Sequence, residues 1–264
     1  MKSLIEIHNE YVIKTENPEF PEIEKYKILN KNNFPIVKLI DVIREGECKK
    51  LKLQKAEKHE LKTTNYDDYA KVIDWLAEIN LILIEEYANL NVDYIKNYYN
   101  EFSKLHEIAC NEDDLFNIKG IKDLPKPIDI FEKFIKIIET DKMVISHGDP
   151  ADSNIGMIEG KIVGFDLGLS SKNHPIVDFA LRTGAQATEY PRNLDINAEL
   201  RKYLNKIHYS CKNIEQKYAV IGCIYGCYME KEPVLSILND GSKSKYYEWC
   251  NVTLNRYKKY SKGV

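Results

Sequence analysis

The feature that most constrains this sequence is a run of polar residues set between apolar strands near the middle of the chain. Residues 143–145 predict a short strand, and residues 146–149 continue from it as a polar loop. Residues 155–165 then predict a β-hairpin, and its second strand ends at residues 166–168, where a glycine permits a tight turn. The loop, the hairpin and the turn must therefore fold around one point.

Three polar side chains mark this point. Asp149 lies on the loop, Asn154 precedes the hairpin, and Asp166 follows its second strand. Because these positions lie at the same ends of neighbouring strands, we expect the two carboxylates and the amide to converge. Mg²⁺ prefers oxygen ligands of this kind and usually keeps several of its waters. The segment therefore predicts a magnesium site.

The first part of the chain predicts a small β-rich unit. Strands are expected at residues 4–7, 11–14, 36–43 and 51–55, with a helix over residues 22–30. The first two strands flank a short polar turn and are expected to form a hairpin. The third is rich in β-branched residues, which favour strands.

Beyond about residue 60 the apolar period becomes helical. Apolar residues recur at helical spacing from Tyr69 to Leu83. Further helices are expected around residues 130–138, 194–209, 214–232 and 246–257. The fold class is therefore α+β, with a β-rich N-lobe at residues 1–57 and a mostly helical C-lobe at residues 58–264.

Composition excludes several classes of protein. The 264 residues include 38 Lys and Arg against 41 Asp and Glu, a formal net charge of −3, so no basic excess favours nucleic-acid binding. No apolar run approaches the roughly 18 residues of a membrane span, and the N-terminus lacks a signal-peptide pattern, so we expect a cytoplasmic protein. The six cysteines are scattered, and we expect buried thiols without disulfides.

The polar segment resembles the active-site core of eukaryotic-type kinases, with an aspartate, an asparagine five residues later and a following Asp-x-Gly. Its His-Gly-Asp variant is similar to the aminoglycoside phosphotransferase family, and most closely to the aminoglycoside 3′-phosphotransferases. The matching residues are Ser146-His147-Gly148-Asp149, Asp152-Ser153-Asn154-Ile155, Gly160-Lys161, Gly164-Phe165, Asp166-Leu167-Gly168 and Asp178-Phe179-Ala180.

This resemblance implies a two-lobed protein-kinase-like fold and transfer of the γ-phosphoryl group of ATP, or of GTP, to a hydroxyl of a small molecule. Asp149 would be the catalytic carboxylate, and Asn154 and Asp166 would bind Mg²⁺. His147 would brace the catalytic loop.

The resemblance extends into the N-lobe. Residues 11–14 are similar to the kinase strand whose lysine contacts the phosphates, which assigns that role to Lys14. The helix over residues 22–30 would supply the glutamate that pairs with this lysine, and its register favours Glu24 over Glu22. Residues 54–57, with Lys55 and Glu57, would form the hinge whose backbone groups bind adenine.

Two features depart from the family pattern. Only thirteen residues precede Lys14 and none is glycine, so the N-lobe lacks the Gly-rich loop that covers the phosphates, and we expect weak nucleotide binding. The C-terminus is basic, where the family's C-terminus contributes acidic residues. By the resemblance, the remaining candidates for contacts with a cationic acceptor are Asp152, Glu112, Asp113 and Asp114.

The residues leave more than one function open. The main interpretation is a small-molecule kinase, and an aminoglycoside-like acceptor makes antibiotic phosphorylation one form of it. One alternative is a pseudokinase-like protein that senses a nucleotide without turnover, because the Gly-rich loop is missing. Another is an atypical protein kinase. The sequence predicts no oligomeric state.

Overall fold

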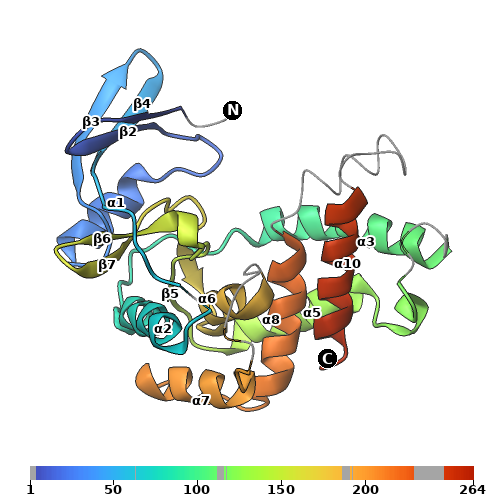
Figure 1. Ribbon diagram of the computed structural model, residues 1–264. Helices are drawn as coiled ribbons and strands as arrows, with labels where there is room; N and C mark the ends of the chain where they lie inside the picture. Colours follow the sequence, from blue (N-terminus) through green and yellow to red (C-terminus); the bar gives the residue numbers. More distant parts are fainter. Residues whose placement is uncertain are drawn as a thin grey trace.

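The computed structural model describes residues 4–62, 64–111, 116, 118–185, 191, 193–228 and 247–264. A small antiparallel sheet with one helix, α1, lies at one end of the molecule, and helices make up most of the rest (Figure 1). Between them lies the hairpin of β6 and β7. This mixed architecture confirms the predicted fold class.

The sheet has four strands in the order β1-β2-β4-β3. They are β1 (Ile5–Ile7), β2 (Tyr11–Thr15), β3 (Leu39–Glu45) and β4 (Cys48–Gln54). The predicted N-terminal hairpin is confirmed, with Ile5 opposite Lys14. The third strand begins later than predicted, because Ile36 and Val37 pair with Gly164 of the central hairpin instead of joining the sheet.

Helix α1 (Ile23–Lys31) agrees with the prediction within one residue. Its buried face includes Tyr26 and Leu29, one helical turn apart. No residue at its start caps the helix through its own side chain. Instead, the Glu16 carboxylate accepts hydrogen bonds from the N–H groups of Glu22 and the next residue, at 3.1 and 3.0 Å, and so satisfies two donors of the first turn.

Helices form most of the remaining chain. The longer ones are α2 (Tyr66–Leu81), α3 (Val92–Asn111), α5 (Pro127–Thr140), α7 (Ile196–Lys206), α8 (Ile214–Tyr228) and α10 (Tyr247–Ser261). Short segments are α6 (Ile176–Ala180), a π-helical turn (Leu181–Ala185) and two 3₁₀ turns (Ile121–Asp123 and Asp152–Asn154). The predicted helices are confirmed, α3 is additional, and the predicted end of α8 lies outside the described residues.

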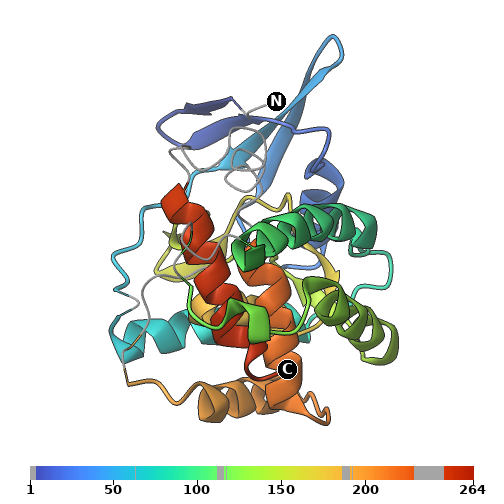
Figure 2. The ribbon, with the colours of Figure 1, turned by 90° about the vertical axis from the view of Figure 1, so that its right-hand side faces the viewer.

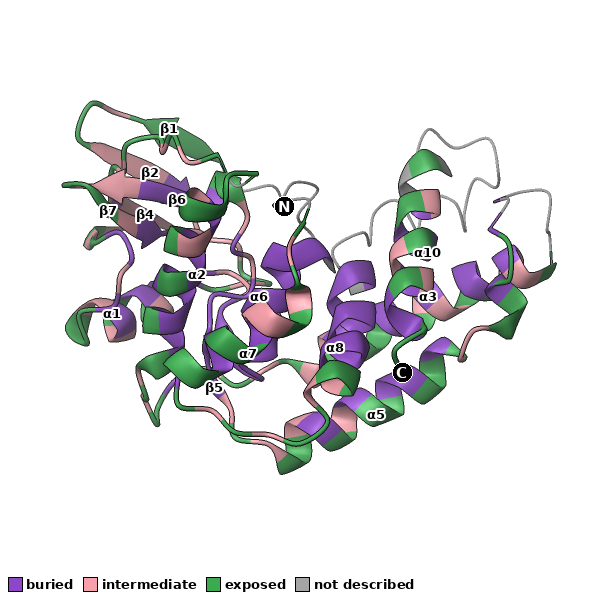
Figure 3. Ribbon diagram, turned by 60° about the horizontal axis from the view of Figure 1, so that its bottom comes forward, coloured by how far each residue is buried: buried purple, intermediate pink, exposed green. Residues whose placement is uncertain are grey.

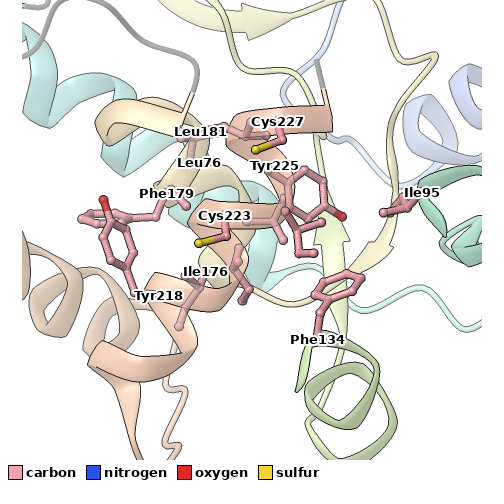
Figure 4. Packing of buried hydrophobic residues seen from close by; sticks show 14 of the residues in the cluster. Leu76, Ile95, Phe134, Ile176, Phe179, Leu181, Tyr218, Cys223, Tyr225 and Cys227 are labelled. Carbon is pink, nitrogen blue, oxygen red and sulfur yellow. The ribbon is translucent and has the colours of Figure 1, made fainter. Parts of the chain in front are cut away.

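Helix α8 is the centre of the helical part. It is buried without interruption from Tyr218 to Cys227, and α5, α6 and α10 pack around it (Figures 3 and 4). Figure 2 shows α10 running beside α8. The two helices pack tightly at Gly222, where a Cβ atom would lie 2.3 Å from the Tyr260 ring. A helix buried on all sides explains why this segment is apolar all round.

Two short strand pairs carry the polar segment. Strand β5 (Val144–Ser146) pairs with β8 (Ser171–Asn173), and β6 (Ile155–Ile158) pairs with β7 (Lys161–Gly164), which confirms the predicted hairpin. The hairpin also pairs with the first part of the chain, through Glu57 with Met157 and Ile36 with Gly164. The division into lobes at residue 57 stays a prediction.

Cysteine burial agrees in part with expectation. Cys223, Cys227 and Cys250 are buried, Cys48 is exposed, and Cys110 and Cys211 are partly exposed. Among the residues described above, no helix is both long and apolar enough to cross a membrane.

Candidate functional site

The loop that follows β5 is held in place by one buried carboxylate. Asp178 of α6 is completely buried. Its two oxygens accept hydrogen bonds from the Ser146 hydroxyl at 2.7 Å and from the N–H groups of His147 and Gly148, both at 2.9 Å. Asp178 thus fixes the backbone just before Asp149. Asp178 belongs to the family motif, but the motif alone predicts no role for it. A carboxylate within an apolar run nevertheless indicates a buried hydrogen-bonding function.

Gly148 is required by the shape of this loop. Its φ is +81°, and a Cβ atom there would lie 2.3 Å from the carbonyl oxygen of Leu169. The loop therefore passes so close to the backbone of Leu169 that only glycine fits at position 148. This close approach brings residues 148 and 169 together.

His147 supports the loop from the inside. Its Nδ1 accepts a hydrogen bond from the N–H of Asp149 at 3.4 Å, and its ring lies edge-on to Trp75 with centroids 5.6 Å apart. Burial lowers the pKa of His147, although Asp178, Asp149 and Asp166 oppose that effect. These contacts support the bracing role that the sequence predicts.

The hairpin brings Asn154 and Asp166 to the same place. The Asn154 amide donates to the carbonyl of Asp149 at 3.1 Å, which closes the loop. The N–H of Phe165 donates to the carbonyl of Asn154 at 2.9 Å, so Asp166 is the next residue beyond this pairing. The convergence of Asp149, Asn154 and Asp166 follows from these two bonds.

Asp166 is held in an unusual backbone conformation. Its φ is +61°, in the left-handed region that non-glycine residues seldom adopt. Its N–H donates to the Tyr26 hydroxyl at 3.1 Å, and its Oδ1 accepts from the Lys14 ammonium at 2.9 Å. The Asp166 side chain stays half exposed, so its carboxylate can reach a ligand as well as Lys14.

Lys14 pairs with Glu22, and the predicted partner Glu24 is wrong. The Lys14 ammonium lies 2.5 Å from Glu22 Oε1, and both side chains are buried. Glu24 is exposed and pairs with Lys27 at 2.7 Å. Residue 22 shares the buried face of α1 with Tyr26, whereas residue 24 lies about 200° further around the helix. Burial opposes the charge on Lys14, but Glu22 and Asp166 outweigh it and raise the pKa of Lys14.

Helix α1 also binds the backbone that follows Asp166. The second oxygen of Glu22 accepts from the Leu167 N–H at 3.0 Å. The Lys25 ammonium donates to the carbonyls of Leu167 at 3.0 Å and Gly168 at 2.6 Å. Burial lowers the pKa of Lys25 to about 8.

The hinge differs from the prediction. The N–H and C=O of Glu57 both pair with Met157, each at 2.9 Å, so Glu57 cannot offer them to adenine. The N–H of Lys55 donates to the Glu10 carbonyl at 3.1 Å, and the Lys55 ammonium donates to the His8 carbonyl at 3.0 Å. Because successive peptide groups of an extended chain alternate in direction, those of Ala56 are the better candidates.

Asp152 is engaged by a buried cation. Arg182 NH2 lies 2.5 Å from Asp152 Oδ1, and Arg182 NH1 donates to the Pro150 carbonyl at 3.2 Å. The arginine side chain is 3% exposed and the aspartate 50%. The contact favours an anchoring role for Asp152, and its role toward an acceptor stays a prediction. Arg182 could not be predicted as a partner of Asp152 from the sequence, because the two residues are thirty positions apart. Glu112, Asp113 and Asp114 lie outside the described residues.

The donor set fits Mg²⁺ better than a metal held by protein alone. Within the described part of the chain, no group of three or more His, Cys, Asp or Glu residues could hold a metal ion. One carboxylate and one amide, Asp166 and Asn154, suit Mg²⁺, which takes its other oxygens from water and substrate phosphates. The Asn154 amide also donates to the carbonyl of Asp149, so such an ion would lie near the loop that carries the catalytic candidate.

No protein-family model matches this sequence, and no curated protein matches it at a significant level. Solved structures do match. A protein of Ralstonia eutropha assigned as an aminoglycoside phosphotransferase aligns with a TM-score of 0.64 at 12% identity, over 99% of this chain and 93% of its own. A choline/ethanolamine kinase family protein of Mesorhizobium loti gives 0.64 at 10%, over 100% and 85%.

A third structure carries ligands. It is an aminoglycoside phosphotransferase of Streptomyces rimosus in complex with ADP and streptomycin, which aligns with a TM-score of 0.50 at 12% identity, over 82% of this chain and 87% of its own. At these identities the likeness concerns the fold. The chain therefore has the kinase-like fold that aminoglycoside phosphotransferases share with choline/ethanolamine kinase family proteins.

Proposed function

We propose that this protein transfers the γ-phosphoryl group of ATP, or of GTP, to a hydroxyl of a small molecule. The observation that carries the proposal is a set of polar groups on adjoining segments. Glu22 and Asp166 both contact Lys14, the residue before Asp166 pairs with the backbone of Asn154, and the Asn154 amide donates to the carbonyl of Asp149. Phosphoryl transfer needs a cation at the phosphates and a carboxylate at the acceptor hydroxyl, and this set supplies groups for both.

Each residue has a defined task in this proposal. Lys14, held by Glu22, binds the phosphates of the nucleotide. Asn154 and Asp166 would hold Mg²⁺, which neutralises charge on the phosphates when bound. Asp149 orients the acceptor hydroxyl and accepts its proton as the new oxygen–phosphorus bond forms. The bond between the γ-phosphorus and the bridging oxygen breaks, and the nucleoside diphosphate leaves.

The acceptor is proposed only as a class. Among proteins with this fold, one was solved with streptomycin and another is described as a choline/ethanolamine kinase family protein. Both names point to small molecules that carry hydroxyl and cationic groups. We therefore place amino sugars and amino alcohols first among candidate acceptors. Antibiotic resistance and the cytoplasmic location stay predictions.

A screen for phosphate transfer tests the function. The protein is incubated with ATP, Mg²⁺ and a panel of hydroxylated metabolites, amino alcohols and kanamycin-type amino sugars, and products are followed by the mass gain of one phosphate. Asp149→Asn keeps the shape of the side chain but removes its charge, so turnover should fall by about 10²-fold or more while ATP affinity changes little.

The outcomes separate the alternatives. Binding of Mg²⁺-ATP without transfer to any acceptor would favour the nucleotide-sensing protein. Transfer to the protein itself or to a second protein would favour the protein kinase. Turnover of Asp149→Asn within a few-fold of the wild type would remove Asp149 from the catalytic role.

A further inference from the structure

The start of helix α1, together with Glu22 just before it, faces the turn at residues 166–168. This turn includes the candidate metal ligand Asp166. Glu22, Lys25 and Tyr26 have the spacing i, i+3 and i+4, which places side chains on one side of a helix. All three reach the backbone of residues 166–168. This contact joins α1 in the N-terminal part to the segment that follows the central hairpin (Figure 1).

Each of these side chains satisfies a different backbone group. Tyr26 accepts from the N–H of Asp166, and Glu22 accepts from the N–H of Leu167. Lys25 alone supplies donors, and it reaches the carbonyls of Leu167 and Gly168. The Leu167 carbonyl also accepts from the N–H of Ser170 at 3.0 Å, but no other side-chain donor contacts either carbonyl within the part of the chain that the structure describes.

The turn needs this support for two reasons. Asp166 has a φ of +61°, a conformation that an aspartate does not favour and that its surroundings must impose. In addition, the Gly168 carbonyl is half-buried and would lose its donor without Lys25, which is costly, whereas the Leu167 carbonyl keeps the N–H of Ser170.

The neighbouring lysine of the same helix shows that this contact is specific. Lys27 is exposed and pairs with Glu24 at 2.7 Å, on the side of α1 that faces away from the turn. Lys25 is half-buried, and its ammonium donates to two main-chain oxygens of the turn. The two lysines have the same chemistry and different surroundings, so they form a matched pair for an experiment.

We propose that Lys25 is a positioning residue, which holds the 166–168 turn in the conformation that presents Asp166 to Mg²⁺. The role of Asp166 toward the metal rests on the proposed function. Lys25 itself touches neither nucleotide nor acceptor in this assignment, because its ammonium is occupied by the two carbonyls.

The test compares Lys25→Met with Lys27→Met. Methionine keeps much of the length of the side chain and removes its donors. In Lys25→Met, we expect the Mg²⁺ concentration for half-maximal ATP binding, measured by calorimetry, to rise about tenfold. The Gly168 carbonyl loses its charge-assisted donor, whereas the Leu167 carbonyl keeps the N–H of Ser170, so the effect is that of about one such bond. Lys27→Met should match the wild type, and Lys25→Arg, which keeps N–H donors, should recover most of the loss.

A second measurement does not depend on nucleotide binding. The N–H groups of Asp166 and Leu167 are bonded to α1, so a loosened turn should expose them. Hydrogen exchange of a peptide spanning residues 165–169 should therefore become at least about tenfold faster in Lys25→Met and stay unchanged in Lys27→Met.

The outcomes are distinguishable. Unchanged exchange in Lys25→Met would overturn the positioning role, whatever the protein binds. Faster exchange with an unchanged Mg²⁺ requirement would also overturn it, because the contact would then be structural only. A wild type that binds no ATP with Mg²⁺ would overturn the proposed function, and the exchange experiment would still decide whether Lys25 holds the turn.

Discussion

The two segments that form the site are supported in different ways. The loop that carries Asp149 is fixed by Asp178, a buried carboxylate on a helix of the same helical part of the chain. The turn at residues 166–168 is fixed by β2 and by the start of α1, which lie in the first part of the chain. One support is internal, and the other crosses from one part of the molecule to the other.

Mutations that remove the two supports should therefore have different consequences. Removing the internal support leaves buried N–H groups without acceptors, so the fold itself should suffer. Removing the crossing support releases Asp166, whose side chain is half exposed, so ligand binding should suffer more than stability. The following experiments test this contrast.

The largest effect is expected for Asp178→Ala. Three donors would lose their buried acceptor, and one kcal/mol or more for each gives a loss of about 3–5 kcal/mol in the free energy of unfolding. Urea denaturation measures this quantity. Glu24→Ala offers a control, because that carboxylate and its partner Lys27 are both exposed and their loss should cost little. A loss below about 1 kcal/mol for Asp178→Ala would contradict the internal support.

The same part of the molecule should be sensitive to acid through His174. This side chain is completely buried, donates through Nε2 to Asp141 at 3.0 Å, and accepts through Nδ1 from Ile176 at the start of the helix that carries Asp178. Burial lowers the pKa of His174 to about 4, although Asp141 opposes the shift and Lys217 adds to it.

The direction in which the free energy of unfolding changes with pH follows from proton uptake by His174. Below about pH 6.5 the unfolded chain binds a proton at this position that the folded protein does not bind until about pH 4. The free energy of unfolding should therefore fall across this window, by about 3 kcal/mol for this group. Denaturation of the wild type and of His174→Asn at pH 7 and pH 4.5 measures the difference, and equal pH slopes in both would refute the assignment.

The smallest effect is expected for the crossing support, and it should appear in binding. In Glu22→Gln, Lys14 loses the charge of its buried partner while the hydrogen bond from Leu167 can persist. The Kd for Mg²⁺-ATP should rise about tenfold. Glu24→Gln is the matched control and should stay within about twofold, since surface pairs contribute little. Equal effects of the two variants on calorimetric binding would restore Glu24 as a candidate partner of Lys14.

Much of the local structure was predictable from the sequence. Apolar periodicity and turn residues predict the central hairpin, the strand that carries Lys14 and most of the helices. Helix α3 was not predicted, because tyrosine and histidine make up much of its buried face, including Tyr98, Tyr99 and His106. Strand β8 consists of three polar residues whose pairing depends on β5, so its sequence carries no strand pattern.

The site was predictable where its residues are close in sequence. Asp149, Asn154 and Asp166 lie on one loop and hairpin, and their convergence follows from local geometry. Glu22 was predictable in principle, since it precedes the buried Tyr26 by four residues. Arg182 and Lys25 were not, because their partners lie thirty and more than a hundred residues away, and neither contact follows from local periodicity.

The carboxylate of Glu16 has a consequence for how α1 can move. It binds the first N–H groups of α1 and follows Lys14 by two residues, while Glu22 at the same helix end binds Lys14 itself. The end of β2, the connecting loop and the start of α1 are thus joined in a closed ring of hydrogen bonds. An outward swing of the helix would have to open this ring at several bonds together. The lysine–glutamate pair is therefore built into the resting state of the protein, and its assembly needs no separate activating event.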